Sequence, residues 1–446
     1  MERILELFCG AVPPALLTVG LYFGVRLRFF PFFHPIATAK RMLSRGAGKE
    51  GSLRATAMAL AGTVGVGNMA GVAVALLSGG AGAVFWMWVS ALAAMLLKYA
   101  EITLALDSRT PDGLGGTPAS FIKAGLVRVG KFFALLCLFN SFLLGGAVQS
   151  GAVRDAFADS FGTPPLAVAL LLVLVTLPPL FGGGKRIASL TARLVPFMCI
   201  FYLVAACLVI GFHAAALPDA VCRIFRDAFS PDAATGGILG FLTSRGLREG
   251  VARGLMSNEG GCGTAPLAHA TASPRHPADQ GIFGILEVGV DTLVICTLTA
   301  LALLTAFPDL PEGLSAMALV RAAFSSALGE IGGHAVALAL FFFAYATLLC
   351  QGFYGEAALA FLTKNRIART LFRLIFLASV ALGALAPTDR IFLVTDALLA
   401  ILTLTNLALL FARSGRIVAL TREAGLLPPK RRIQDPSLPM KSPPQR

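Results

Sequence analysis

Long apolar segments separated by short polar stretches dominate the pattern of this 446-residue chain. The segments are residues 12–33, 55–77, 82–106, 132–153, 164–181, 190–212, 236–257, 281–306, 333–362, 370–386 and 391–412. An α-helix needs about 20 apolar residues to cross the hydrocarbon core of a bilayer. The chain is 56% apolar and only 14% charged, which is more apolar surface than a soluble core can bury. The pattern therefore predicts an all-α polytopic membrane protein with about 11 transmembrane helices.

The second apolar segment contains a glycine-rich interruption, Gly62–Gly71, which reads GTVGVGNMAG. Non-helical backbone inside a bilayer exposes unpaired N–H and C=O groups, and it is tolerated only where these groups line a cavity or bind a ligand. Broken helices of this kind are typical of secondary transporters. The alternative is glycine used for close helix packing. That alternative is weaker because these glycines fall on every face of the helix and Asn68 lies among them.

The basic residues separate into two groups when successive loops are assigned alternately to the two sides of the membrane. All but six of the 37 Lys and Arg residues fall on one side, the exceptions being Arg3, Arg154, Arg223, Arg226, Arg321 and Arg390. Because cytoplasmic loops carry the excess of Lys and Arg, we expect the N-terminus outside and the C-terminus inside. The net charge of +13 is then explained by topology and lipid headgroups, without a nucleic-acid partner. A transporter domain over 1–427 precedes a proline-rich, basic tail over 428–446, for which we expect disorder in the cytoplasm.

Internal symmetry is suggested by hydropathy and glycine position. If the segment 12–33 is set aside as an extra N-terminal helix, ten spans remain, in a first half over 55–212 and a second half over 218–412. Each half begins with an interrupted span, the second interruption being Thr235–Gly240. Because five spans separate the two interruptions, the halves run in opposite directions, as in an inverted repeat whose site lies at the membrane midplane.

Several long strings resemble the alanine or glycine:cation symporters, also called sodium:alanine symporters, of the amino acid-polyamine-organocation superfamily. They are GLYFGVRLRFFPF at 20–32, GTVGVGNMAGVAVAL at 62–76, AVFWMWVSALAAMLLKYAE at 83–101, GGGKRIA at 182–188, GVARGLMSNEGGCGTAPLAHA at 250–270, DTLVICTLTAL at 291–301 and YGE at 354–356. The resemblance covers nearly the whole chain. It implies the leucine-transporter type of 5+5 inverted repeat preceded by one extra helix. It also implies uptake of a small neutral amino acid, coupled to sodium or a proton, with no covalent chemistry.

The first interruption can hold a carboxylate. Unwound N–H groups at Val66, Gly67 and Asn68 lie at the start of a half-helix, and helix N-termini are ready anion sites. Gln149 resembles a family glutamine that faces the substrate, although an interhelical hydrogen bond worth about 1 kcal/mol is the alternative. The expected substrate ligands are Thr63, Val66, Gly67, Asn68, Gln149, Gly236 and Gly237.

The same interruption can hold a cation, because backbone carbonyls are hard oxygen donors. Thr347 resembles one hydroxyl of the family's Ser-Thr pair that completes a sodium site, but Ala346 stands where that pattern has serine. One oxygen ligand is therefore missing, which leaves Na+ or H+ open as the coupling ion. A membrane threonine can also simply bond its own helix. The expected cation ligands are Ala61, Thr63, Val64, Asn68 and Thr347.

Asp291 and Glu287 lie four residues apart, hence on one face of the eighth span. Ionisable groups within a span are costly enough to suggest function. Two carboxylates on one face can share a proton, so we expect a proton or gating role, with a solvated Glu287 at the cytoplasmic mouth as the alternative.

Other polar residues have weaker assignments. Lys98 and Glu101 are three residues apart near the cytoplasmic end of their span and are expected to form an ordinary ion pair. Asp396, near the outer end of the last span, is a candidate gate residue or an interfacial one. The Ser257–Glu259 segment is expected in the inward loop after the seventh span, as a structural cap or inner gate.

Rival functions have less support. A membrane-embedded enzyme would need a constellation of catalytic side chains, but the five histidines fall in or beside the predicted loops and no HExxH motif occurs. A channel could also use broken helices, but no repeated filter string is present. The eight cysteines show no CxxC spacing, so neither a disulfide framework nor a zinc site is expected. We expect a monomeric symporter in the lipid bilayer of a prokaryotic inner membrane, with Na+ as coupling ion and no covalent cofactor.

Overall fold

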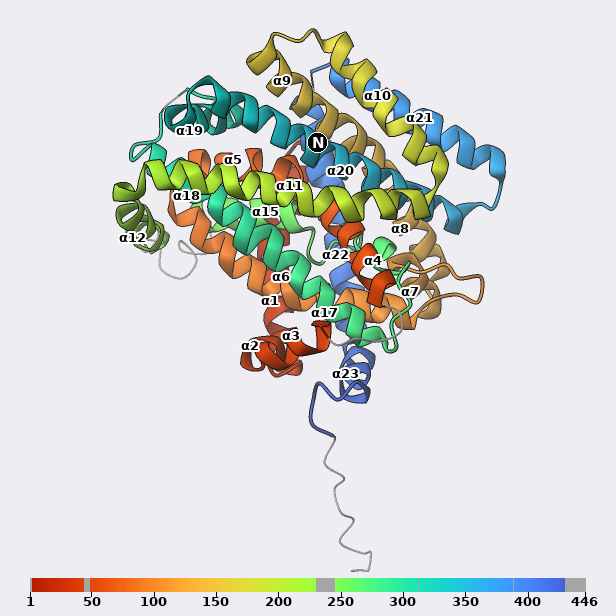
Figure 1. Ribbon diagram of the computed structural model, residues 1–446. Helices are drawn as coiled ribbons and strands as arrows, with labels where there is room; N and C mark the ends of the chain where they lie inside the picture. Colours follow the sequence, from red (N-terminus) through yellow and green to blue (C-terminus); the bar gives the residue numbers. More distant parts are fainter. Residues whose placement is uncertain (1, 44–48, 230–244, 312, 388, 430–446) are drawn as a thin grey trace, which may run out of the picture.

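A computed structural model describes residues 2–43, 49–229, 245–311, 313–387 and 389–429. Every regular element within these ranges is a helix, as expected (Figure 1). The elements are α1 (Glu2–Arg26), α2 (Phe30–Phe33), α3 (Pro35–Leu43), α4 (Lys49–Thr63), η1 (Val66–Asn68), α5 (Ala70–Gly79), α6 (Gly82–Asp107), α7 (Thr117–Lys123), α8 (Val127–Asn140), η2 (Ser141–Val148), α9 (Gln149–Phe161), α10 (Pro165–Gly182), α11 (Gly184–Phe212), η3 (Ala214–Ala216), α12 (Leu217–Ala228), α15 (Arg245–Asn258), α16 (Pro266–His269), α17 (Pro277–Val288), η4 (Gly289–Cys296), α18 (Thr297–Ala306), α19 (Ala316–Leu328), α20 (Glu330–Leu362), α21 (Arg366–Leu385), α22 (Asp389–Ala412) and α23 (Ser414–Glu423).

Eight helices in these ranges are long and apolar enough to cross a membrane. The broken pair formed by α4 and α5, bent by 62°, brings the number to nine. This is fewer than the eleven expected. The segment predicted over 236–257 accounts for part of the difference, because the described part of it is α15, which has 14 residues and carries three arginines.

The first predicted span, 12–33, is placed too far along the chain. Helix α1 ends at Arg26, and Arg28 and Phe29 adopt left-handed conformations with φ of 54° and 47° before α2 begins. The ring of Phe29 folds back onto the turn of α1 that contains Gly24, where a Cβ atom would lie 2.3 Å from the ring. This back-folding ends the helix, although the aromatic residues that follow continue the apolar pattern.

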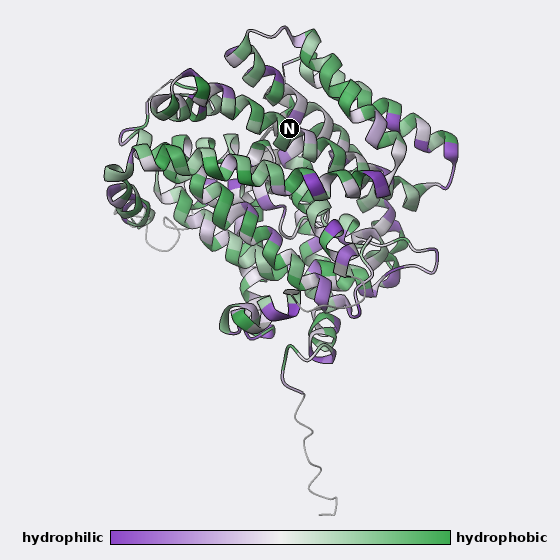
Figure 2. Cartoon of the chain, viewed as in Figure 1, coloured by the Kyte–Doolittle hydropathy of each residue, from purple (hydrophilic) through white to green (hydrophobic). Residues whose placement is uncertain are grey.

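Exposed apolar side chains cover the outside of the helix bundle. Hydrophobic residues run along α10, α11 and α21, whereas hydrophilic residues gather at helix ends and loops (Figure 2). Leu174 of α10, Ile200 of α11 and Leu382 of α21 are each more than 60% exposed. Such a surface suits lipid, whereas a soluble monomer rarely exposes contiguous apolar patches of this extent.

Helix α6 is buried because small residues on two neighbours let them approach closely. A Cβ at Gly250 of α15 would lie 2.3 Å from the Ala83 carbonyl oxygen, and one at Gly281 of α17 would lie 2.3 Å from Thr103 Oγ1. Close packing through small residues is the usual means of helix association in membranes. It places Lys98 and Glu101 of α6 in the protein interior.

Candidate substrate and cation site

The first interruption is present where it was predicted. Helix α4 stops at Thr63, and the chain resumes as the short η1 and then α5. The N–H of Gly65, which would bond to the Ala61 carbonyl in a continuing helix, donates instead to Asn68 Oδ1 at 2.8 Å. The N–H of Asn68 likewise donates to the Gly65 carbonyl at 3.2 Å rather than to Val64. The carbonyls of Ala61 and Val64 are thereby released from the helical ladder.

Two predicted side chains from distant helices meet this interruption. Thr347 Oγ1 of α20 lies 3.4 Å from the Val64 carbonyl oxygen and 3.1 Å from that of Phe343 in its own helix. Gln149 Oε1, at the start of α9, accepts a hydrogen bond of 3.4 Å from the N–H of Val66. The structure therefore brings both predicted side chains to the opened backbone.

Gly65 is the residue around which these groups assemble. Its φ of −145° and ψ of −152° are extended values that other residues can adopt. Space is what requires glycine, because a Cβ at this position would lie 2.7 Å from Thr347 Oγ1 and 3.3 Å from Gln149 Oε1. The absence of a side chain leaves a backbone surface at which two polar side chains converge.

Asn68 has partners on three elements and is completely buried. Its Oδ1 accepts from Gly65 within the interruption, while its Nδ2 donates to Asp291 Oδ1 at 2.7 Å and to Ser257 Oγ at 3.1 Å. Asn68 thus ties the interruption to α15 and η4. Thr63 is also committed, because its hydroxyl approaches the carbonyls of Ala59 and Leu60 in its own helix.

Asp291 and Glu287 belong to separate networks, so the expectation that they share a proton is not supported by their contacts. Asp291 receives hydrogen bonds from Asn68, from Ser257 at 2.7 Å and from Thr292 at 2.9 Å. Glu287 lies 3.2 Å from Lys98 Nζ and 2.9 Å from His269 Nε2. The π-helical segment η4 begins between the two carboxylates, and π-helical turns are frequently found at functional sites.

The structure differs from the sequence-based assignments of three neighbouring groups: the expected Lys98–Glu101 pair, the alternative of a solvated Glu287, and the loop position of His269. The ion-pair partner of Lys98 is Glu287 of α17, since the pairing predicted from the three-residue spacing with Glu101 does not form. Glu287 is completely buried rather than solvated at the mouth of the protein. His269 was placed with the loops, but it is completely buried in α16 and contacts this pair.

The structure shows an interruption that was not predicted, between α15 and α16 in the string EGGCGT. This segment is called the second interruption from here on. Glu259, Gly261 and Gly263 have φ values of 49°, 85° and 78°, so the backbone leaves the helical path three times. Ser257, Asn258 and Glu259 are each only 1% exposed, in contrast to the expected position in an inward loop. The glycine density of this string matches that of the first interruption and was the signal that could have identified it. Gly236 and Gly237, where the break was predicted, lie outside the described residues.

The second interruption is linked to the helix that carries Thr347. Gln351 Nε2 of α20 donates to Glu259 Oε1 at 3.1 Å, and Thr264 Oγ1 donates to Glu259 Oε2. The Asn68–Ser257 hydrogen bond joins the first interruption to the last turn of α15, directly before the second interruption. Opened backbone from two separate segments, together with α9 and α20, therefore surrounds one region of the interior.

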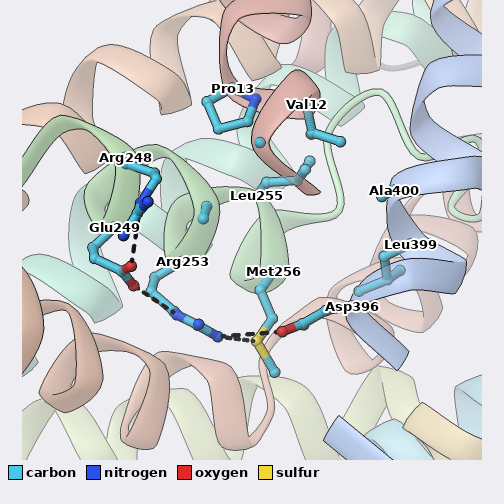
Figure 3. A pocket seen from close by; sticks show the side chains of 12 residues that line it. Val12, Pro13, Arg248, Glu249, Arg253, Leu255, Met256, Asp396, Leu399 and Ala400 are labelled. Atoms are coloured by element: carbon cyan, nitrogen blue, oxygen red, sulfur yellow. Dashed lines mark hydrogen bonds and ion pairs between the residues drawn. The ribbon is translucent and has the colours of Figure 1, made fainter. Parts of the chain in front are cut away.

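A cavity of about 570 Å³ opens beside this region. It is lined by Val66 and Gly67 of the first interruption and, further out, by Asp155, Asp159 and Asp396. A neighbouring cavity of about 380 Å³ shares part of its lining with the first, namely Arg253, Met256 and Asp396. Figure 3 shows Arg253 between Glu249 and Asp396. Arg253 Nε lies 3.6 Å from Glu249 Oε2, and Arg253 Nη1 lies 4.0 Å from Asp396 Oδ2.

Comparison with known proteins gives a consistent result. The sequence matches the profile of the sodium:alanine symporter family over residues 4–424. It is 36% identical to the sodium/alanine symporter AgcS of Methanococcus maripaludis over 425 residues, covering 91% of this chain and 92% of the relative. It is 35% identical to the probable sodium/glutamine symporter GlnT of Bacillus subtilis, covering 93% and 89%.

Solved structures resemble the fold at low sequence identity. The transporter MhsT in complex with L-phenylalanine has a TM-score of 0.55 at 16% identity, covering 86% of this chain and 90% of that one. A Na+-coupled sialic acid symporter has a TM-score of 0.51 at 13% identity, covering 94% and 85%. The all-helical fold of the leucine-transporter type, implied by the resemblance, is confirmed.

Proposed function

Because the chain belongs to the sodium:alanine symporter family, we propose that it imports a small neutral amino acid, such as alanine or glycine, together with Na+ by alternating access. The observation that carries this proposal is the opened backbone at 64–68, where freed carbonyls and N–H groups face Thr347 and Gln149. A zwitterion and a cation need these two kinds of group side by side. No covalent step is required of any residue.

The amino acid is assigned to the N–H groups of Val66 and Gly67. These lie at the lining of the larger cavity, and N–H groups at the start of a half-helix favour a carboxylate. Gln149 Oε1, which bonds to the Val66 N–H, would be displaced from it by the substrate carboxylate. A Cβ at Gly67 would lie 3.4 Å from Ser257 Cα, so α15 packs directly against this part of the interruption.

The cation is assigned to the carbonyls of Ala61 and Val64 and to the hydroxyl of Thr347. Carbonyl and hydroxyl oxygens are hard donors suited to Na+. Ala346 supplies no second hydroxyl, and the hydroxyl of Thr63 bonds its own helix. We therefore assign to Thr347 the side-chain contribution to this site.

Thr347→Ala is expected to raise the Na+ concentration at half-maximal uptake about tenfold, the effect of losing roughly 1.4 kcal/mol of binding free energy. The maximal rate at saturating Na+ should change little. Thr191→Ala is the control, because Thr191 is also completely buried but its hydroxyl bonds only carbonyls of its own helix. An unchanged Na+ dependence in Thr347→Ala would remove Thr347 from the cation site.

The larger cavity is assigned as the outer access path, with Arg253 and Asp396 as gating residues at its rim. It joins the first interruption to a surface that carries three aspartates and one arginine. We further propose a monomeric prokaryotic inner-membrane protein with the N-terminus outside and the C-terminus in the cytoplasm, as the loop distribution of Lys and Arg indicates. Arg253, which that distribution counts on the cytoplasmic side, is an exception in this assignment because it lies beside Asp396.

Proton coupling is the second candidate, and Asp291 is the observation that favours it. This carboxylate is completely buried, and its hydrogen-bond donors are the neutral side chains of Asn68, Ser257 and Thr292. A buried carboxylate among neutral donors can take up a proton at a modest cost.

Uptake of labelled alanine into proteoliposomes, with the two ion gradients imposed separately, tests the proposal. We expect an inward Na+ gradient alone to drive accumulation above equilibrium, and an inward proton gradient alone to leave the level at equilibrium. Accumulation driven by protons without Na+ would replace the proposal with the second candidate, and Asp291→Asn should then abolish it.

A further inference from the structure

A cluster of polar side chains lies on α6, α7 and α22, away from the assigned cation ligands. Glu101 Oε2 of α6 accepts hydrogen bonds from the N–H of Gly263 at 3.1 Å and from Asn406 Nδ2 at 2.8 Å. Asn406 Nδ2 also donates to the Gly261 carbonyl at 2.8 Å. Glu101 and Asn406 are 2% and 0% exposed. The cluster therefore holds the second interruption through Gly261 and Gly263.

Three oxygen atoms in this cluster are buried without a hydrogen-bond partner among the described residues. They are Glu101 Oε1, Asn406 Oδ1 and Thr117 Oγ1. Buried polar groups are normally satisfied, and each one left without a partner costs about 1–3 kcal/mol. Because the three residues all contact Gly263, these oxygens indicate a bound partner that oxygen lone pairs can coordinate.

Gly263 provides the point on which these side chains converge. A Cβ at Gly263 would lie 3.0 Å from Thr117 Oγ1 and 3.0 Å from Asn406 Cγ. The N–H of the same residue binds Glu101. Side chains from three separate helices thus surround one glycine, which adds no atoms of its own to the space beside it.

The charges in this region do not balance. Glu101, Glu259 and Glu287 are all buried to 2% exposure or less, and Lys98 pairs with Glu287. Within the described part of the chain, no basic nitrogen forms an ion pair with Glu101. An isolated carboxylate is costly to bury, so buried charges are normally paired or bind a metal.

We propose that Glu101, Asn406 and Thr117 bind a second Na+ ion. A carboxylate, an amide carbonyl and a hydroxyl are all hard oxygen donors suited to an alkali cation. A proton on Glu101 would also neutralise the carboxylate, and the Na+ count described below separates a bound proton from a bound ion. Because Gly261 and Gly263 belong to the second interruption, this ion would stabilise the backbone opposite the first cation site. The inference rests on the proposed sodium coupling.

The test counts the Na+ ions bound by the purified full-length protein in detergent, using ²²Na+ at saturation. Glu101→Gln is expected to bind one Na+ fewer than the parent protein. Thr117→Val is expected to lower the affinity of one ion about tenfold, although the hydroxyl that it removes makes no hydrogen bond. Thr176→Val is the matched control, because Thr176 Oγ1 of α10 is also buried and unpartnered, and it should bind Na+ like the parent.

Thr117→Val also separates ligand binding from a purely structural role. Replacing an unpartnered buried hydroxyl by a methyl group should not destabilise the fold, so this variant remains informative if Glu101→Gln fails to fold. The proposed site predicts a smaller thermal stabilisation by Na+ in Thr117→Val than in Thr176→Val.

An unchanged Na+ count in Glu101→Gln, or equal Na+ stabilisation in the two threonine variants, would overturn the second site and leave the first intact. A parent protein that binds no Na+ would overturn the sodium coupling as well.

Discussion

Gly65→Ala should reduce the initial rate of Na+-driven alanine uptake by about tenfold or more, while the protein still folds. The backbone angles at Gly65 suit alanine, so conformational strain is not the cause. The added methyl group would lie 2.7 Å from Thr347 Oγ1 and 3.3 Å from Gln149 Oε1. It must therefore push at least one of these side chains away from the opened backbone. Initial uptake rates in proteoliposomes, normalised to reconstituted protein, provide the measurement.

Gly71→Ala is the matched control for this substitution. Gly71 lies in the adjoining helix α5 and also lines the larger cavity, but nothing lies within 4 Å of the position that its Cβ would occupy. Uptake should stay within about twofold of the parent, because alanine is favoured over glycine in a helix. Equal loss in both variants would show that glycine flexibility, rather than the space at Gly65, is what transport requires.

The second large effect is expected at the buried ion pair of Lys98 and Glu287. Both side chains are completely buried, 3.2 Å apart, and removing one charge leaves the other uncompensated. Lys98→Met should therefore lower the free energy of unfolding by about 3–5 kcal/mol. Lys98→Met combined with Glu287→Met should recover much of this loss, because two apolar side chains of similar size replace the pair. Both the loss and the recovery are measured by thermal unfolding in detergent, with size-exclusion chromatography reporting the folded protein that remains after heating.

Lys364→Met serves as the control, since Lys364 forms a 2.6 Å ion pair with Asp112 in which both side chains are more than 60% exposed. Exposed ion pairs contribute little to stability, so no measurable change in thermal unfolding is expected. A double variant as unstable as Lys98→Met alone would contradict the account. In that case Glu287 would have to act through His269 or another partner rather than through Lys98.

The first interruption could be predicted from the sequence because its signal is local. Four glycines and Asn68 within ten residues of an apolar segment are incompatible with an ordinary membrane helix, whatever surrounds them. The structure places the predicted Thr347 and Gln149 side chains beside this segment. Both side chains were predicted as site residues from their resemblance to family positions. Nothing in the local pattern links them, because they lie 198 residues apart in the sequence.

The interruption at EGGCGT was not predicted from the sequence because hydropathy follows composition rather than burial. Helix α15 carries Arg245, Arg248, Glu249 and Arg253, so it reads as the polar end of a span. Its last turn and the EGGCGT string are nevertheless buried. Glycines on α15 and α17 allow close packing against α6, and this tertiary contact is not visible in a hydropathy profile.

The buried charges could not be paired from sequence for a related reason. Spacing suggests partners only within one helix, and it favoured Lys98 with Glu101 and Asp291 with Glu287. The actual partners lie on other helices: Lys98 reaches α17, Asp291 reaches Asn68 and Ser257, and Glu101 reaches Asn406. Each of these contacts depends on how the interrupted segments lie against their neighbours.

Equilibrium binding of labelled alanine to the purified protein, in Na+ and in an equal concentration of K+, tests most directly whether the opened backbone holds both solutes. If the freed carbonyls and N–H groups form one joint site, binding will saturate in Na+ and fall to background in K+. Saturable alanine binding of equal affinity in K+ would contradict the account, because the amino acid would then occupy its site without the cation beside it.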